Sequence, residues 1–209
     1  MSKKRSPKAG GGNKYGEFSG EPLTEWVGDA PEPNRQMVLR ADFWYDDPNR
    51  RRWWARAGRT VDGASIPRAL WTIVGSPYTG CYRKASVVHD IACEDAANPA
   101  ERKVADKMYY PACRRGGCSK AVAIVQYLGV RIGAWIPNVA MWRTADAAGR
   151  SKADQLLRLA ADHSIVGTFY EILYEIGDLD EADIEVVDAI IDRHLEAKTD
   201  RLAKPGRKR

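Results

Sequence analysis

Histidine, phenylalanine and long apolar runs are scarce in this sequence, and each shortage limits what the protein can be. The 209 residues include 3 His and 3 Phe. The longest apolar stretch, residues 121–137, is interrupted by Gln126 and Arg131, so it falls short of the roughly 18 consecutive apolar residues of a membrane-spanning helix. This stretch predicts a buried helix, with an interfacial segment as the alternative.

A secretory signal is also missing from the sequence. The N-terminal segment MSKKRSPKAGGGNK is charged and then glycine-rich, without the apolar region that such a signal needs. We therefore expect cytoplasmic synthesis, with release only by cell lysis or inside a particle such as a virion. In that compartment the default state of the 4 cysteines is a reduced, buried thiol.

The charge is distributed unevenly, and this divides the chain into four segments. The net charge is +5, and basic residues without acidic ones gather at both ends. We predict a disordered basic arm over residues 1–20, a core domain with a polar site over 21–143, an acidic helical extension over 144–202, and a basic tail over 203–209. Such ends serve solubility, or contact nucleic acid or anionic lipid weakly and without specificity.

Periodicity predicts an α+β fold: a small N-terminal β-hairpin or sheet packed on a helical core with an antiparallel helix pair, plus a helical C-terminal extension. Residues 37–60 alternate like strands, with a hairpin turn over 46–51. Pro67 is suited to the first turn of a short helix that ends at Val74. Three longer helices are expected at 81–95, 99–114 and 119–135. In the extension, an apolar stripe predicts packing on the core or on another protein; it comprises Ile184, Val187, Ile190, Ile191 and Leu195.

The residues that are candidates for catalysis or metal binding lie in and near two segments, VDGASIP at 61–67 and SVVHDIAC at 86–93. If the chain reverses at residues 98–99, residues whose numbers sum to about 195 face each other across the helix pair. His89 then faces Asp106. A carboxylate that holds one imidazole nitrogen leaves the other available as a base. This pattern makes His89 and Asp106 the candidate catalytic residues.

Asp62, the Gly63 carbonyl and Asp90 form a candidate metal site. Asp90 points about 100° away from His89 around the helix, toward the Asp-Gly turn. An oxygen-rich, dianionic site suits calcium or magnesium. A base beside such a cation activates water for attack on an ester. The simpler interpretation is that Asp62 caps its own turn and that His89 is a core histidine with a satisfied hydrogen bond.

Zinc is not expected from the sequence. His89 has no second histidine nearby, and a C-x₄-C pair at Cys113 and Cys118 together with Cys93 lacks the spacing of a zinc knuckle. A metal-dependent phosphohydrolase of the His-Asp type is excluded as well, because it requires a histidine upstream of the His-Asp pair. If a disulfide forms, the helix-facing argument favours Cys81 with Cys113.

The motifs DGASIP, SPYTGCYRKASVVHD and ERKVADKMYY resemble a phage-associated bacterial domain family of unknown function, DUF1353. The resemblance covers residues 37–135 and implies a bacteriophage context without an established activity. A second, weaker resemblance is to the short secreted phospholipase A₂ enzymes of bacteria and fungi. It implies that His89 is the base, that Asp106 orients it, and that Asp62, Gly63 and Asp90 hold calcium. Ala64 stands where those enzymes have a cysteine.

Residues 50–59, RRRWWARAGR, interleave arginine and tryptophan. Nucleic-acid and anionic-membrane surfaces use this pattern, but so does a hairpin with alternate residues in the core. If the segment is a hairpin, Trp53 and Trp54 point to opposite faces.

Two functional hypotheses follow. The first is a phage-type, calcium-dependent phospholipase-like ester hydrolase that acts on phospholipid or an anionic membrane surface. The second is a non-enzymatic, virion-associated or protein-interaction module in which the cluster of His89 and Asp106 is structural and the C-terminal helices contact a protein partner.

Overall fold

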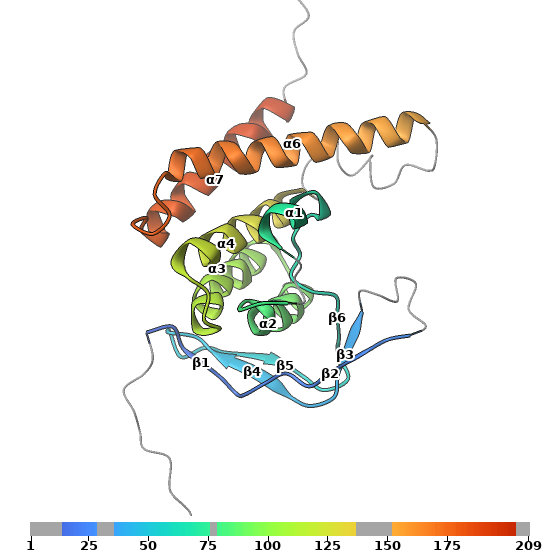
Figure 1. Ribbon diagram of the computed structural model, residues 1–209, viewed down its shortest axis with the longest axis vertical. Coiled ribbons are helices and arrows are strands. Elements are labelled where there is room, and N and C mark those ends of the chain that lie inside the picture. Colours follow the sequence, from blue (N-terminus) through green and yellow to red (C-terminus); the bar gives the residue numbers. More distant parts are fainter. Residues whose placement is uncertain (1–13, 29–35, 76–78, 137–151, 204–209) are drawn as a thin grey trace, which may run out of the picture.

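The chain folds as an α+β protein, as predicted, with two small antiparallel sheets on one side of a helical core (Figure 1). The computed structural model describes residues 14–28, 36–75, 79–136 and 152–203. One sheet has the order β1 (Glu17–Phe18), β4 (Phe43–Asp46), β5 (Arg52–Ala55); the other has the order β2 (Thr24–Trp26), β3 (Met37–Leu39), β6 (Thr60–Val61). The helices are η1 (Arg68–Leu70), α1 (Trp71–Val74), α2 (Arg83–Glu94), α3 (Pro99–Arg115), α4 (Lys120–Trp135), α6 (Lys152–Ile176) and α7 (Ile184–Ala203).

The N-terminal arm is shorter than the sequence predicts. Strand β1 lies inside the segment 1–20 and pairs with β4. The Tyr45 hydroxyl donates a hydrogen bond to the Tyr15 carbonyl at 2.7 Å. The prediction of a disordered arm is therefore wrong for residues 14–20, because β4 offers an open strand edge and the buried Tyr45 phenol needs an acceptor. Residues 1–13, 137–151 and 204–209 lie outside the described residues, so the predictions for them stay predictions.

The predicted hairpin is formed by β4 and β5, joined by the turn at residues 47–51. Asp46 is opposite Arg52, and Trp44 is opposite Trp54. Phe43 and Tyr45 are buried, as are Trp53 and Ala55, whereas the alternate side chains face outward. Trp53 and Trp54 therefore do lie on opposite faces of the sheet, as the alternation indicates.

Helices α2, α3 and α4 begin and end within two residues of their predicted bounds. Asn98 caps α3 by accepting a hydrogen bond from the Glu101 amide at 3.0 Å, while the Glu101 carboxylate accepts from the Ala97 amide at 2.9 Å. Ser119 caps α4 by accepting from the Val122 amide at 3.2 Å. These polar caps satisfy amides that have no partner inside the helix. They place the chain reversals that set α2 against α3, and α3 against α4.

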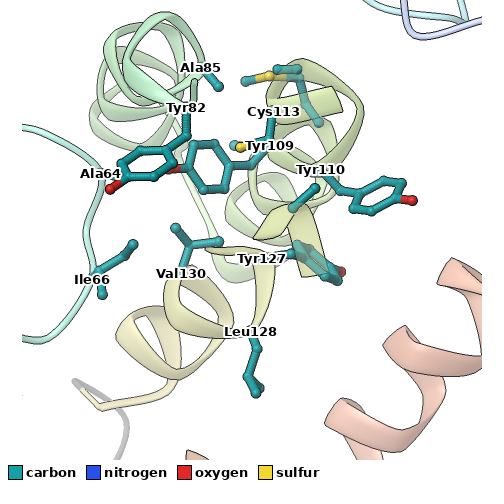
Figure 2. Close-up of a cluster of buried hydrophobic side chains, with 14 of the residues drawn as sticks. Ala64, Ile66, Tyr82, Ala85, Tyr109, Tyr110, Cys113, Tyr127, Leu128 and Val130 are labelled. Atoms are coloured by element: carbon teal, nitrogen blue, oxygen red, sulfur yellow. The ribbon is translucent and has the colours of Figure 1, made fainter. Parts of the chain in front are cut away.

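Apolar side chains from the three helices and from the loop after β6 meet in one core (Figure 2). Ile66 of the loop, Tyr109 of α3 and Val130 of α4 are each at most 5% exposed. The strands contribute the inward side chains of the hairpin from the opposite side of α2. The core is therefore continuous between the sheets and the helices.

The loop at residues 64–67 packs closely on α4 at two glycines. An added Cβ at Gly133 would lie 1.8 Å from the Ser65 carbonyl oxygen, and one at Gly129 would lie 3.3 Å from Ile66. These glycines are one helical turn apart, so they share one face of α4. Their missing side chains let the loop approach the helix backbone.

The disulfide pairing differs from the prediction. Cys81 is bonded to Cys118, and Cys113 is a free, buried cysteine. The helix-facing argument fails here because the chain turns back after α3. An added Cβ at Gly116 would lie 2.1 Å from the Cys81 carbonyl oxygen, so Cys81 lies against this turn and meets the cysteine that follows it. The expectation of reduced thiols is wrong for this pair.

The C-terminal extension is an antiparallel pair of helices, α6 and α7, packed across α4 (Figure 1). Val187, Ile191 and Leu195 of the predicted apolar stripe are at most 6% exposed, and Ile184 and Ile190 pack against the core. Of the two alternatives left open by the sequence, packing on the core is the one observed.

We predict that Gly133→Ala lowers the free energy of unfolding by about 1–3 kcal/mol or more, because the added methyl group meets backbone that cannot move independently. Gly167→Ala is the matched control in α6, where an added Cβ meets no described atom within 4 Å. It should raise stability by up to about 1 kcal/mol through helix propensity. Urea unfolding of both variants checks this, and equal stability of the two would contradict the close approach.

Candidate functional site

His89 and Asp106 face each other across α2 and α3, as the sequence predicts. His89 Nε2 lies 2.8 Å from Asp106 Oδ1. The His89 side chain is 0% exposed and the Asp106 side chain is 1% exposed. The two residues are therefore hydrogen-bonded in the interior of the protein.

Burial lowers the pKa of His89, because the charged imidazolium loses its hydration; the bond to Asp106 acts in the opposite direction. The imidazole is therefore neutral at neutral pH, with one nitrogen protonated. The Tyr109 ring packs beside it, with centroids 4.8 Å apart. A neutral imidazole has the protonation state of a base, but its role as one depends on access.

Two arginines approach the Asp106 carboxylate besides His89. Arg102 Nε lies 3.3 Å from Oδ1, and Arg131 Nε lies 3.9 Å from Oδ2. Among the described residues, Asp106 Oδ2 and Arg102 Nη2 are buried atoms without a hydrogen-bond partner. The carboxylate is thus electrostatically balanced, with part of its hydrogen-bonding capacity unused.

Arg131 continues this network into the C-terminal extension. Its guanidinium forms ion pairs with Asp188, and with Asp192 at 2.5 Å, both on α7. Lys107 and Lys103 of α3 reach the same two carboxylates at 2.6 and 2.5 Å. Sequence reasoning missed this network. Two sequence patterns could have indicated it. Arg131 lies inside a largely apolar predicted helix, and Asp188 and Asp192 are four residues apart beside the apolar stripe of residues 184–195.

Asp90 anchors the Asp-Gly turn of the predicted calcium site. Its Oδ2 accepts a hydrogen bond from the Asp62 amide at 2.7 Å, and the Gly63 amide also bonds to the carboxylate. Gly63 has a φ of 93°, in the region that favours glycine. The structure therefore brings Asp62, Gly63 and Asp90 together. The contact is between amides and a carboxylate, and calcium binding stays a prediction.

Burial and the nearby charge of Asp62 raise the pKa of Asp90, while the two amides act in the opposite direction; together they place this pKa at about 8. A metal ion placed between the carboxylates would remove this repulsion. Without one, Asp90 is protonated at or below neutral pH.

Cys93 lies one turn after His89 on α2 and faces the same side. Its Sγ is 3.3 Å from His89 Nε2 and 4.0 Å from Asp106 Oδ1. Burial raises the pKa of the Cys93 thiol, so the sulfur is protonated in the metal-free protein. A protonated thiol is a poor nucleophile. The sulfur lies near both nitrogens of the His89 ring, 3.3 Å from Nε2 and 3.7 Å from Nδ1, so the three side chains form one cluster.

A pocket of about 720 Å³ borders this cluster. The residues that line it include Cys93, Arg102 and Asp106, together with Trp135 of α4 and Leu195 of α7. His89 is not among the described residues that line it. Cys93 and Asp106 therefore border the pocket, whereas the imidazole does not.

The arginine–tryptophan segment forms the outer face of the hairpin. Arg56 stacks over the Trp54 ring at 3.6 Å from its centroid, and Arg52 lies 5.4 Å from it. Both arginines also form ion pairs, with Asp42 at 2.8 Å and Asp46 at 2.7 Å. These ion pairs offset much of the positive charge. Binding of nucleic acid or membrane by this face stays a prediction.

Comparison with known proteins identifies a family for the central part of the chain. Residues 37–130 match the sequence model of the family described as "Protein of unknown function (DUF1353)". This match confirms the resemblance seen in the sequence motifs. It covers β3 to most of α4, and so includes every residue of the candidate catalytic and calcium sites.

Two relatives from Sinorhizobium fredii share this region. The chain is 43% identical to Uncharacterized protein y4jT over 86 residues, which are 41% of this chain and 25% of that protein. It is 32% identical to Uncharacterized protein y4iH over 102 residues, 49% of this chain and 42% of that protein. The chain thus matches less than half of each relative. No solved structure shows significant similarity.

None of the helices in the described segments is long and apolar enough to cross a membrane.

We predict that stability falls as the pH rises from about 4 to about 8. The pKa of Asp90 is higher in the folded state than in the unfolded state, so the folded protein binds more protons in this window. The slope contributed by this group is at most about 1.4 kcal/mol per pH unit. In Asp90→Asn this contribution should disappear. Urea unfolding across the pH range checks the prediction, and an unchanged slope in the variant would contradict it.

Proposed function

We propose that the chain, whose residues 37–130 match this family of unknown function, is a non-enzymatic protein-interaction module. In this proposal the cluster around His89 and Asp106 is structural. It fixes the helices α6 and α7 on the family domain, and these helices present the surface that binds a protein partner.

The complete burial of His89 carries the proposal. A general base has to reach the proton that it removes, directly or through one water molecule. Here the imidazole is 0% exposed. One nitrogen is held by Asp106, the ring packs on Tyr109, and the lining of the adjacent pocket includes Cys93 and Asp106 but not His89. This arrangement supports a histidine that stabilises the core.

The ion pairs between α3, α4 and α7 support the structural role further. Arg131 is 7% exposed and connects the Asp106 carboxylate to Asp188 and Asp192. A buried charge is tolerated only where opposite charges surround it, so α7 has one favourable position on the domain. Apolar packing alone would allow the helix to slide. The network therefore gives the extension a defined orientation.

The surface at the far end of the extension favours a basic, partly apolar partner. Tyr174 is 91% exposed, Val186 is 56% exposed and Tyr170 is 52% exposed. Exposed acidic residues lie near them in the sequence; these are Glu171, Glu175, Asp178, Asp180, Glu181 and Glu185. Glu171 is paired with Lys198, and Glu175 with Arg193. Exposed aromatic side chains amid acidic ones suit an amphipathic segment with lysine or arginine on its flanks.

We predict that Asp106→Asn lowers the free energy of unfolding by about 2 kcal/mol or more, because it leaves His89 and two arginines without their carboxylate. The matched control is Asp95→Asn, which removes an exposed ion pair with Arg59 (2.9 Å) and should change stability by less than about 1 kcal/mol. Urea unfolding in the presence of a chelator measures both.

An enzymatic role gives the opposite result. Asp106→Asn would then keep its stability and lose hydrolysis of phospholipid vesicles that the wild-type protein carries out in millimolar calcium. That outcome would overturn the structural role.

The second candidate is the calcium-dependent, phospholipase-like hydrolase. The observation in its favour is that His89 is neutral and paired with Asp106 at 2.8 Å, next to the assembled group of Asp62, Gly63 and Asp90. In this candidate His89 is the base, Asp106 orients it, calcium binds at the turn, and phospholipid is the substrate. A rise in the melting temperature in millimolar calcium supports it, since a ligand that binds only the native state stabilises that state.

We predict that the exposed tyrosines bind a basic amphipathic helical peptide. A fluorescent peptide of lysine and leucine, with its leucines at helical spacing (i, i+3, i+4, i+7), should show saturable binding by anisotropy that weakens as salt increases. Tyr170→Ala with Tyr174→Ala should weaken binding about tenfold or more without changing stability. Trp44→Ala, on the distant sheet face, is the control. Equal binding by the tyrosine and tryptophan variants would show that the extension is not the docking surface.

A further inference from the structure

We propose that His89, Cys93 and Asp106 form a zinc site whose fourth coordination position opens into the pocket beside α7. This inference goes beyond the proposed function, because it assigns a ligand to the cluster that would otherwise serve only as a packing element.

The three side chains converge from two helices. His89 and Cys93 are separated by four positions on α2, so they point to one side of the helix, and Asp106 faces them from α3. The ligand atoms all lie within 4.8 Å of one another. The separations are 2.8 Å from His89 Nε2 to Asp106 Oδ1, 3.3 Å from Nε2 to Cys93 Sγ, and 4.0 Å from Sγ to Oδ1.

These separations fit a tetrahedral ion after small side-chain movements. Zinc bonds of about 2.0–2.3 Å place neighbouring ligand atoms about 3.3–3.7 Å apart. Entry of the ion would lengthen the contact between His89 and Asp106 by about half an ångström and shorten that between Cys93 and Asp106 by a similar amount. Rotation about the side-chain bonds is sufficient for both changes, so the helices keep their positions.

The mixture of donor atoms identifies the metal class. Calcium and magnesium prefer all-oxygen ligands, whereas zinc binds imidazole nitrogen, thiolate sulfur and carboxylate oxygen together. The sequence argues against zinc because His89 has no second histidine nearby. The structure places the Cys93 sulfur where that second ligand would be.

A buried acceptor atom in the cluster also favours a cation. Asp106 Oδ2 is buried and has no hydrogen-bond partner among the described residues, so the carboxylate can turn toward an ion. Arg102 and Arg131 lie at the same carboxylate and would orient it from outside the coordination shell. Zinc with one thiolate and one carboxylate is neutral overall, and the thiol proton leaves to solvent.

The pocket leaves room for a fourth ligand. Cys93 and Asp106 line a space of about 720 Å³, which is large enough for a water molecule and a small-molecule ligand. Three protein ligands with an open position are typical of zinc that binds an exchangeable ligand, whereas structural zinc has four protein ligands. The fourth position is therefore expected to hold water or another exchangeable ligand.

The test uses tag-free, full-length protein with its disulfide intact, dialysed against a chelator and then supplied with zinc or cobalt. Wild-type protein should bind one cobalt ion per chain and show a thiolate-to-cobalt charge-transfer band. Cys93→Ser should lose the band and bind zinc at least about 100-fold more weakly. Cys113→Ser removes the other free cysteine among the described residues and should bind as wild type does.

A second measurement needs no variant. Zinc should protect Cys93 of the wild-type protein from alkylation by iodoacetamide, while the modification of Cys113 stays unchanged, as read by peptide mass spectrometry. Wild-type protein that retains no zinc, or Cys93→Ser that binds it as tightly as wild type, would overturn the proposal. The stability test of Asp106→Asn is made in chelator, so failure of the zinc site and failure of the interaction module give separate results.

Discussion

The buried carboxylate of Asp106 is the group on which the arrangement of the helices depends. It is hydrogen-bonded to His89 of α2 and accepts a hydrogen bond from Arg102 of its own helix, α3. It also forms an ion pair with Arg131 of α4. A carboxylate at 1% exposure is stable only if positive or donating groups replace the lost water. Each partner therefore has to be present, and two of the three come from helices other than α3, which the core has to position.

This constraint extends to the C-terminal helices through Arg131. Its guanidinium is shared between the helical core and α7, so the core and the extension are connected by charge as well as by apolar packing. Apolar contacts are non-directional, whereas ion pairs define one register. The pocket at this junction has walls from both parts, and a ligand bound there would contact the domain and the extension together.

Much of the fold and the pairing of His89 with Asp106 could be predicted, because they follow from local patterns. Strand alternation located the hairpin, and the capping residues Asn98 and Ser119 located the helix starts. Once α2 and α3 are antiparallel neighbours, counting along each helix is enough to pair residues. The same counting failed for Cys81, because it assumes that α2 extends back to this residue, whereas α2 begins at Arg83 and Cys81 is bonded to Cys118 beyond the end of α3.

By itself, the sequence determined the α+β class, the helix bounds, and the facing of His89 and Asp106, since each depends on residues within a few turns of one another. Only the tertiary structure decided that His89 is completely buried and that Cys93 contacts it. The ion pairs of Arg131 with Asp188 and Asp192 also follow only from the tertiary structure. Burial and long-range charge pairing depend on how α4, α6 and α7 pack. Periodicity shows which face of a helix is apolar, but it does not show which partner covers that face.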